Sequence, residues 1–378
     1  MSDTPSVLQK SPPPAAPEPT STPAVVARPR ARRQSPTKTF LRTVIPLVVA
    51  IIALSIYSNS ENDAFLTTNN FQNILSQVSV LGILAAGQTF LVIGGQLDLS
   101  VGSLVSFVAV VAAKLFGAGW STPSIVLLCL AIGAATGLVW GLVVAFLRVP
   151  PFILTLGGLS VFASLALVLS DNRPISVLSG LASLGFGEWL GIRAPVLVVL
   201  IAMVVLGLVL HFTKFGRNTY ALGSSEQAAY LAGVPTRRLT VQLFVLNSTL
   251  AALGGLIMMA RLSAGDPRSG AGLELTTIAV TVLGGAALAG GRGTMIGAFL
   301  GTVLFGVISA SLTFLQVPGA YQALVSGGIL IFAVVATAIA DLRSGRVRTT
   351  GARAEAFGAA LTGLVTRRPS GPPPAAPH

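Results

Sequence analysis

Charged residues are scarce in this chain. Asp, Glu, Lys and Arg make up 10% of its 378 residues, while 53% are hydrophobic. Soluble chains carry about 25% charged residues, so the composition excludes a protein built of aqueous domains. Cysteine is nearly absent too, and with Cys129 alone no intrachain disulfide can form. Since many apolar stretches approach the roughly 20 residues that span a bilayer, we predict an all-α, polytopic membrane protein.

The sequence also lacks the signals of an enzyme. It contains no Gly-Lys dipeptide, and therefore no G-x-x-x-x-G-K-[ST] loop to hold nucleotide phosphates. Paired catalytic carboxylates, a nucleophilic triad and metal-ligand clusters are not visible, so we expect no catalytic residue, metal or bound cofactor. Acids are nearly absent from the predicted spans, where an ion-coupled secondary transporter would usually place them. This shortage argues against that class, which remains the less favoured alternative.

The net charge of +12 comes mostly from the two ends of the chain. Residues 1–42 hold seven basic and two acidic residues, and residues 341–378 hold six and two. Basic tails beside a membrane are typical cytoplasmic anchors facing anionic lipid, so no nucleic-acid partner is expected. We predict a disordered, Pro-rich cytoplasmic tail over 1–39, a transmembrane domain over 40–341 and a basic cytoplasmic tail over 342–378.

Ten apolar runs are candidate transmembrane spans. They cover residues 40–57, 71–94, 97–115, 123–147, 152–169, 195–212, 241–260, 275–289, 294–313 and 319–340. With both termini inside, the tails and inner loops hold 13 and six basic residues, against five in the outer loops. Lys and Arg are enriched on the cytoplasmic side, so the bias predicts a multi-pass protein of the cell (inner or plasma) membrane with cytoplasmic termini. The outer loop 171–194 has a weakly apolar middle, typical of a re-entrant or surface helix.

A polar stretch over residues 214–239 interrupts the apolar body on the predicted cytoplasmic side. Its middle favours a short helix, because Ser224 and Gln227 have the spacing of a capping box and Glu226 suits the positive end of the helix dipole. Gly233 can adopt the left-handed conformation that ends such a helix. A helix of about two turns buries little surface alone, so we expect this cytoplasmic helix to dock onto a partner.

Glycine gathers at two breaks between spans. One reads GGQLDLSVG over 94–102, and the other GGAALAGGRGTMIG over 284–297. Each combines a Gly-rich turn with one charge, and their similarity suggests an internal repeat, which would point to a transport pathway. Asp98 is either a functional group at membrane depth or a solvated acid at a span end. The candidate pathway residues are Gly94, Gly95, Asp98, Ser100, Gly102, Gly290, Gly291 and Arg292.

Three runs carry a family resemblance. VIGGQLDLSVGSLVS resembles the GG-x-DLSVG signature of permease subunits of ATP-driven (ABC-type) sugar importers, and GGRGTMIGAFLG resembles their second glycine motif. YALGSSEQAAYLAGV resembles their cytoplasmic coupling loop, with its E-x-A-A-x-x-x-G pattern. The resemblance covers residues 69–340. An extra residue, Gln227, before the alanine pair and a missing I-x-L-P element depart from the wider importer pattern, and the chain is most similar to ribose- and xylose-type permeases.

The resemblance implies a subunit that alternates between inward- and outward-facing states and carries a monosaccharide delivered by an extracytoplasmic binding protein. It also implies a second copy of this chain and a two-cassette ATP-binding subunit that holds ATP and Mg. Branched-chain amino acids and nucleosides are alternative solutes. The implied coupling residues are Glu226, Ala228, Ala229, Gly233 and Arg237, whose small alanines would let the helix sit in a groove of the ATPase.

Some of these residues have simpler interpretations. Glu226 also fits a helix-dipole partner, and Arg237 with Arg238 fits a positive-inside anchor. The charges of the loop between the seventh and eighth spans are either ordinary outer-loop charges or a docking surface for the binding protein. These docking candidates are Arg261, Asp266, Arg268 and Glu274.

Overall fold

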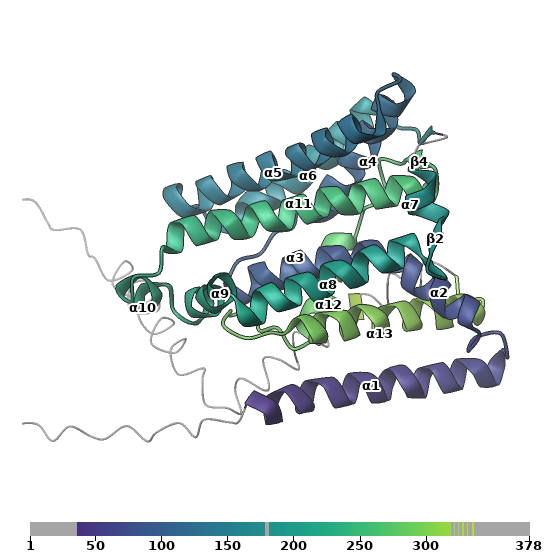
Figure 1. Ribbon diagram of the computed structural model, residues 1–378, viewed down its shortest axis with the longest axis horizontal. Coiled ribbons are helices and arrows are strands. Elements are labelled where there is room, and N and C mark those ends of the chain that lie inside the picture. The colour runs from purple at the N-terminus through teal and green to yellow at the C-terminus, as the bar shows by residue number, and fades with distance from the viewer. Residues whose placement is uncertain are drawn as a thin grey trace, which may run out of the picture.

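The computed structural model of the chain describes residues 36–177 and 181–318, with Tyr321, Leu324, Gly327, Gly328, Ile331 and Val335 beyond them. The two predicted tails and the predicted span 319–340 therefore lie wholly or largely outside the described residues. The described part is helical, as predicted, and its long helices run side by side along the long axis (Figure 1).

The helices follow one another with short connections. Their bounds are α1 Pro36–Glu61, α2 Thr68–Gln77, α3 Ser79–Ile93, α4 Val101–Gly117, α5 Thr122–Leu147, α6 Pro151–Leu169, α7 Ala182–Phe186, α8 Ala194–Phe212, α9 Lys214–Ser224, α10 Glu226–Leu231, α11 Thr236–Leu262, α12 Leu273–Leu283 and α13 Met295–Phe314. The two-residue strands are β1 Ile175–Ser176, β2 Glu188–Trp189, β3 Ile192–Arg193 and β4 Ala264–Gly265. β1 pairs antiparallel with β4, and β2 with β3.

Six of the described helices are long and apolar enough to cross a membrane: α1, α5, α6, α8, α11 and α13. Helices α2 and α3 make a seventh crossing if they count as one span, although they meet at an angle of 49°. α4 and α12 are apolar but only 17 and 11 residues long. The chain is thus a multi-pass membrane protein, and the predicted count of ten spans is not reached by these criteria in the described part.

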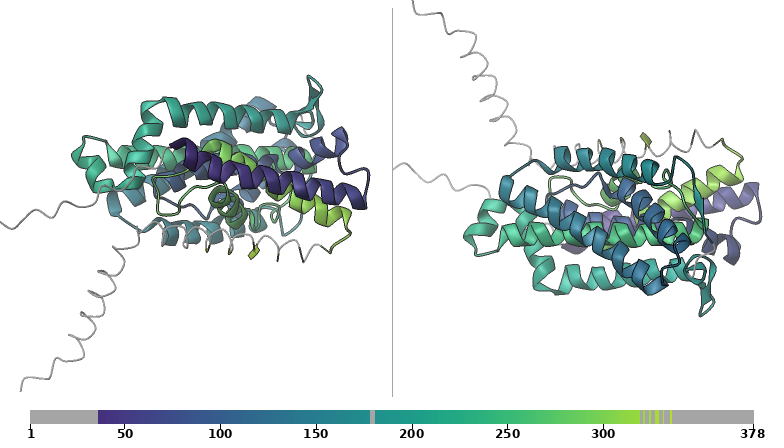
Figure 2. Two further views of the ribbon diagram at one scale, coloured as in Figure 1. Left: turned by 90° about the horizontal axis from the view of Figure 1, so that it is seen from below. Right: turned by 90° about the horizontal axis from the view of Figure 1, so that it is seen from above.

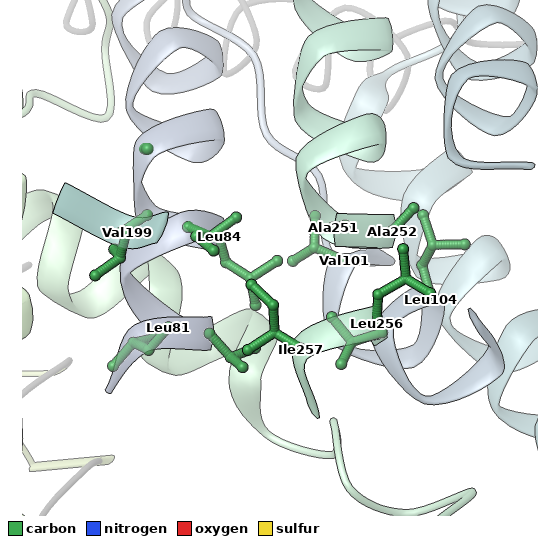
Figure 3. Packing of buried hydrophobic residues seen from close by; sticks show 14 of the residues in the cluster. Leu81, Leu84, Val101, Leu104, Val199, Ala251, Ala252, Leu256 and Ile257 are labelled. Carbon is green, nitrogen blue, oxygen red and sulfur yellow. The ribbon is translucent and has the colours of Figure 1, made fainter. Parts of the chain in front are cut away.

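Helix α11 lies at the centre of the bundle, where it packs against α5, α4 and α3. Buried side chains of α3, α4, α8 and α11 interlock in the core (Figure 3). Among them, Leu84, Val101, Val199 and Ile257 are at most 5% exposed. The same cluster contains small buried residues such as Ala251 and Ala252, and small residues let helices approach closely in lipid.

Glycines set the contact between α5 and α11. Gly133, Gly137 and Gly141 recur every four residues and so share one face of α5. A Cβ at Gly137 would lie 2.3 Å from the carbonyl oxygen of Phe244, and one at Gly141 would lie 2.7 Å from the Cα of Val241. Only glycine permits this approach, and these three residues lie outside the two Gly-rich breaks singled out from the sequence.

Predicted spans were wrong in detail where a helix breaks. The predicted span 71–94 bends at Val78, beside Ser79, whose hydroxyl bonds the carbonyl of Ser76 at 2.7 Å instead of leaving that turn regular. Residues 97–100 precede α4 rather than beginning it, and α12 ends at Leu283 rather than near 289. In the described residues of the loop 171–194, the expected re-entrant or surface helix is reduced to the five-residue α7, beside short strands.

Helix α1 lies along α13 at one side of the bundle (Figure 1). The hydroxyl of Ser58, 1% exposed, donates to the hydroxyl of Ser311 at 2.6 Å. Farther along, Phe65 and Phe314 meet edge to face, with ring centroids 5.4 Å apart. These contacts fix the first helix against the last fully described one.

Candidate functional site

The two Gly-rich breaks share one backbone geometry. In α3 the N–H groups of Gly95 and Gln96 return to carbonyls of the last turn at 3.0 and 2.8 Å, and in α12 those of Gly285 and Ala286 do so at 2.8 and 3.2 Å. Gly95 and Gly285 have φ angles of +76° and +89°. Both endings are therefore Schellman motifs, which need a residue that tolerates positive φ. α3 and α12 also pack against each other. The two breaks are therefore similar in backbone structure as well as in sequence, and the helices that they end are in contact.

Asp98, in the first break, is completely buried within the described chain. Its interpretation as a solvated acid is therefore wrong. One carboxylate oxygen accepts hydrogen bonds from the N–H and hydroxyl of Ser100 at 2.8 and 2.6 Å. The other accepts from the side-chain amide of Asn247, on α11, at 3.1 Å. Because a buried carboxylate needs such donors, the residues of this break are tied to the central helix.

Two further helices hold the same break. The indole N–H of Trp140, on α5, donates to the hydroxyl of Ser100 at 3.2 Å. The N–H of Leu99 donates to the hydroxyl of Thr155, on α6, at 3.1 Å. Residues 98–100 thus connect α5, α6 and α11 by side-chain hydrogen bonds, and a change in the break must alter contacts to all three.

Gly102 brings the first break to the beginning of α12. A Cβ at Gly102 would lie 2.2 Å from a carboxylate oxygen of Glu274 and 2.5 Å from the carbonyl of Gly270. The N–H of Gly270 in turn donates to the hydroxyl of Ser106, on α4, at 2.8 Å. Glu274, assigned from sequence to a docking surface, is half-buried against a predicted pathway residue.

The second break is joined to the first by the backbone. The N–H of Gly291 donates to the carbonyl of Ile93, the last residue of α3, at 2.8 Å. Gly223, near the end of α9, lies against this bond: a Cβ there would be 1.8 Å from the Ile93 oxygen and 2.6 Å from the Gly291 nitrogen. We call Ile93, Tyr220, Gly223, Gly291 and Gly293 the α9 junction.

Tyr220 completes the α9 junction. Its hydroxyl donates to the carbonyl of Gly293 at 2.8 Å, and burial raises the pKa of Tyr220 to about 12. The phenol is therefore protonated, and able to donate, throughout the physiological range. Arg292, beside the junction, is half-buried, and its carbonyl accepts from the N–H of Ala287 at 3.1 Å.

The predicted cytoplasmic helix is α10, at the opposite end of the bundle from β2 (Figure 1). Its cap is Ser225 rather than Ser224, because the hydroxyl of Ser225 accepts from the N–H of Ala228 at 3.2 Å. The hydroxyl of Ser224 instead donates within α9, to Tyr220. Gly233 ends the helix with φ +82°, as predicted.

Helix α9 was not anticipated in the polar stretch. Thr213 begins it by accepting from the N–H of Gly216 at 3.3 Å, and a Thr three residues before a Gly is not a strong signal of a helix start in the sequence. A Cβ at Gly216 would lie 1.9 Å from the carbonyl of Leu210. The tight turn between α8 and α9 thus requires glycine.

The coupling candidates do not all face the same way. Glu226 and Ala228 are exposed, whereas Ala229 is 4% exposed and packs inside its own chain. The expectation that both alanines face a partner is therefore wrong for Ala229. Arg237, at the start of α11, lies with its guanidinium carbon 5.5 Å from the ring centroid of Phe146, a cation–π contact that holds it to α5.

Three of the docking candidates, Arg261, Asp266 and Arg268, lie at the other end of the bundle, whereas Glu274 lies against Gly102. Arg261 donates to the carbonyl of Gln77, at the end of α2, at 3.2 Å. The carboxylate of Asp266 accepts from the backbone N–H of Arg268 at 2.8 Å, and Arg268 itself is exposed. Arg261 therefore links α11 to the end of α2 beside the α2–α3 bend, while the exposed Arg268 is available to a partner.

Buried polar side chains inside the bundle escaped the sequence reasoning. Gln88 on α3, Ser248 on α11 and Thr277 on α12 are fully buried, and their side-chain polar atoms find no hydrogen-bond partner within the described part of the chain. The Oδ1 atom of Asn247 likewise has no hydrogen-bond partner within the described residues. Single polar residues within apolar spans were the available signal. Such groups can bond a polar solute or water, whereas leaving them unpaired costs free energy.

Comparison with known proteins gives a consistent result. The family model described as "Branched-chain amino acid transport system / permease component" matches residues 70–334. The ribose import permease protein RbsC of Bacillus subtilis is 37% identical over 76% of this chain and 89% of its own length. For RbsC of Escherichia coli K12 the figures are 36%, 79% and 94%.

Another relative transports a different sugar. The L-arabinose ABC transporter permease protein AraH of Azospirillum brasilense is 37% identical over 72% of this chain and 80% of its own length. No solved structure matches the chain. The family model covers both Gly-rich breaks, α9 and α10, so the site described above lies inside the matched region. The chain belongs to the branched-chain amino acid transport system / permease component family.

Proposed function

We propose that this chain is the membrane subunit of an ATP-driven importer and carries a monosaccharide across the bilayer. Relatives named for a solute include permeases for ribose, arabinose and xylose, which favours a pentose. The chain would act with a two-cassette ATPase that holds ATP and Mg, with an extracytoplasmic sugar-binding protein and with a second copy of itself. It would contribute no catalytic residue. Branched-chain amino acids and nucleosides remain alternative solutes.

The α9 junction is the observation that supports this mechanism best. α10 is small and exposes Glu226 and Ala228 at one end of the bundle. It is continuous with α9, whose Gly223 contacts the backbone of both breaks. Because close-packed backbones transmit displacement with little compliance, a push on α10 by the ATPase would reach both breaks through α9. Glu226, Ala228, Gly233 and Arg237 would form the receiving surface.

The breaks would then act on the solute pathway. Moving residues 94–102 would disturb the hydrogen bonds of Asp98 to Asn247 and of Ser100 to Trp140, and it would release α11 and α5 from the break. The buried amide of Gln88 and the hydroxyls of Ser248 and Thr277, which have no partner in the described chain, could then form hydrogen bonds with sugar hydroxyls. We assign the gate to these two breaks, with Gly290, Gly291 and Arg292 in the second.

The orientation follows from the basic bias of the loops. α10 would be cytoplasmic, with both termini on the same side, and Arg268 and Asp266 would face the binding protein on the other. The ten predicted crossings would comprise the six long helices, the bent pair α2–α3, the shorter α4 and α12, and residues 319–340. Residues 1–39 and 342–378 would be cytoplasmic tails.

Uptake by purified components tests this proposal. The chain, its ATPase and the sugar-binding protein are reconstituted in proteoliposomes, and entry of labelled ribose, arabinose and xylose is measured with and without ATP. We expect uptake of at least one pentose that requires all three proteins and ATP. Uptake driven by an ion gradient without the ATPase would identify a secondary transporter instead, and uptake of leucine or a nucleoside in place of pentoses would change the solute class.

A further inference from the structure

The hairpin formed by β2 and β3 carries an apolar tip. Its two-residue turn is Leu190-Gly191, and the Leu190 side chain is 94% exposed. Trp189, just before the turn, is 49% exposed, and Phe186, at the end of α7, is 62% exposed. Single exposed apolar residues are ordinary on protein surfaces, but three at one protruding point indicate a contact.

The tip is presented by a defined structure. The side-chain amide of Gln72, on α2, donates to the carbonyl of Gly191 at 2.9 Å. Arg193 donates to the side-chain carbonyl of Asn73, also on α2, and the N–H of Ala194 returns to the carbonyl of Gly187 at 2.8 Å. The base of the hairpin is thus fixed to α2, and the exposure of its tip is built into the fold.

Leucine is an unusual choice for this turn. Leu190 and Gly191 have φ angles of +56° and +74°, as in a type I′ turn, whose first position favours Asn, Asp or Gly. A leucine in the left-handed region is strained, because its Cβ lies close to the following carbonyl oxygen. The chain therefore carries local strain at a point where its side chain contacts almost nothing of the protein itself.

The direction of the hairpin identifies what it meets. Both views of Figure 2 show it projecting sideways beyond α8, rather than along the helix axes. α8 begins at Ala194, directly after β3, and its exposed side chains Ile201, Val204, Val205 and Leu208 form an apolar face. The tip is therefore continuous with a surface that faces the hydrocarbon of the bilayer.

Other aromatic residues lie at the same end of the bundle. Tyr57, near the end of α1, is 54% exposed, and Trp120, between α4 and α5, is 50% exposed. Tyr and Trp gather at the boundary between headgroups and acyl chains, since they are apolar with one polar atom. Trp189 has the same character, next to a helix that enters the membrane at once.

We propose that the tip of the β2–β3 hairpin, Trp189 and Leu190 with Phe186, inserts into the membrane interface at the end of the bundle opposite α10. Its partner is phospholipid. Because the base of the hairpin is bonded to Gln72 and Asn73, the lipid contact also holds α2, the segment beyond the α2–α3 bend. This role is independent of the transported solute and of the ATPase.

Depth-dependent fluorescence quenching tests the insertion. The full chain is placed in nanodiscs made with phospholipids brominated near the headgroup or near the chain ends, and the Trp189 signal is taken as the difference between the parent and Trp189→Phe. We expect an about twofold or larger loss of this signal with the shallow bromines and a smaller loss with the deep ones, as interfacial Trp requires. Aqueous iodide should quench it little.

Leu190→Asn is the decisive variant. It creates the turn sequence that type I′ hairpins prefer, so the hairpin should fold at least as well, but its tip loses the apolar side chain. We expect weaker quenching of Trp189 by shallow bromines and stronger quenching by iodide. Quenching by lipid that is unchanged in Leu190→Asn would remove Leu190 from the anchor.

Three outcomes would overturn the proposal. A Trp189 signal sensitive to iodide and insensitive to brominated lipid would place the tip in water. Protection that appears only with the binding protein would make the hairpin part of that docking surface. Disulfide cross-linking of two Leu190→Cys copies, with no lipid quenching, would make it an interface between copies of the chain.

Discussion

The N–H of Gly291 donates to the carbonyl of Ile93 at 2.8 Å, joining the end of α3 to a loop far along the chain. Both partners are backbone groups, so only proline at position 291, which has no N–H, would remove one of them. Any other substitution must act by adding atoms beside the bond, and Gly223 is the neighbour whose missing side chain leaves room for it.

Gly223→Ala should therefore disrupt the α9 junction. Its Cβ would fall 1.8 Å from the Ile93 oxygen, and relieving such an overlap with backbone costs on the order of 1–3 kcal/mol or more. We expect ATP-dependent uptake to fall at least about tenfold. Gly207→Ala on α8 is the matched control, because its nearest neighbour, Met295, would be 3.5 Å away. Equal uptake by the two variants would contradict the packing described here.

Tyr220→Phe removes one hydrogen bond and leaves the ring. A typical hydrogen bond contributes about 1 kcal/mol, so we expect an about fivefold loss of ATPase stimulation by sugar-loaded binding protein, with normal membrane insertion. Since the pKa of Tyr220 is raised to about 12, the phenol stays protonated below that pH, and the loss should be the same at pH 6 and pH 9. Tyr57→Phe, the same change at an exposed site on α1, should have little effect.

The bond between Asp98 and Asn247 can be tested by exchange. Asp98→Asn would place two amide groups face to face, and hydrogen bonds to charged groups contribute about 1.5–3 kcal/mol. We expect uptake to fall about tenfold or more with expression near normal. The double variant Asp98→Asn/Asn247→Asp restores a donor facing an acceptor and should recover part of the activity. No recovery in the double variant would show that the carboxylate acts at position 98 itself.

The two alanines of α10 should respond differently to enlargement. Ala228 is exposed, so Ala228→Trp should leave thermal stability near the parent value while lowering ATPase coupling. Ala229 is 4% exposed, so Ala229→Trp should lower stability by about 1–3 kcal/mol and reduce the yield of folded protein. Thermal unfolding in detergent separates the two effects. Normal ATP hydrolysis and uptake by Ala228→Trp would exclude α10 as the contact with the ATPase.

Cysteine labelling tests the orientation. Asp63→Cys, between α1 and α2, should react with a membrane-impermeant maleimide in intact cells. Gln227→Cys, on α10, should react only after permeabilisation. Both positions are exposed, and the single native cysteine, Cys129, is buried and should stay silent. The reverse pattern would invert the proposed topology.

Composition was sufficient to predict an all-helical membrane protein, because the apolar runs dominate every other signal. The breaks in those runs were harder. The endings at Gly94 and Gly284 follow from paired glycines, which are a strong local signal. At the bend at Val78 the hydroxyl of Ser79 bonds the carbonyl of Ser76, and a serine hydroxyl is too common in spans to mark a bend in the sequence. Span length alone therefore overestimated the number of long, straight helices.

The site was predicted in its parts and not in its assembly. The Gly-rich breaks and α10 were found because glycine and capping residues act locally. Asp98 was located, but its burial depends on Asn247 and Trp140, which are distant in sequence. The contact of α9 with both breaks could not be predicted from the sequence. Glycine is needed at position 223 because a side chain there would overlap the backbone of Ile93 and Gly291. Contacts made by the absence of a side chain have no sequence pattern of their own.

The pairing of Ser58 with Ser311 sets an order of events during biosynthesis. The two hydroxyls are separated by 253 residues, which a ribosome adds in on the order of 10–50 s. Helix α1 leaves the ribosome first, and its main partner, α13, is among the last segments made. Throughout that interval the Ser58 hydroxyl lacks its Ser311 partner, so the pairing of α1 with α13 can form only after the intervening helices have been made.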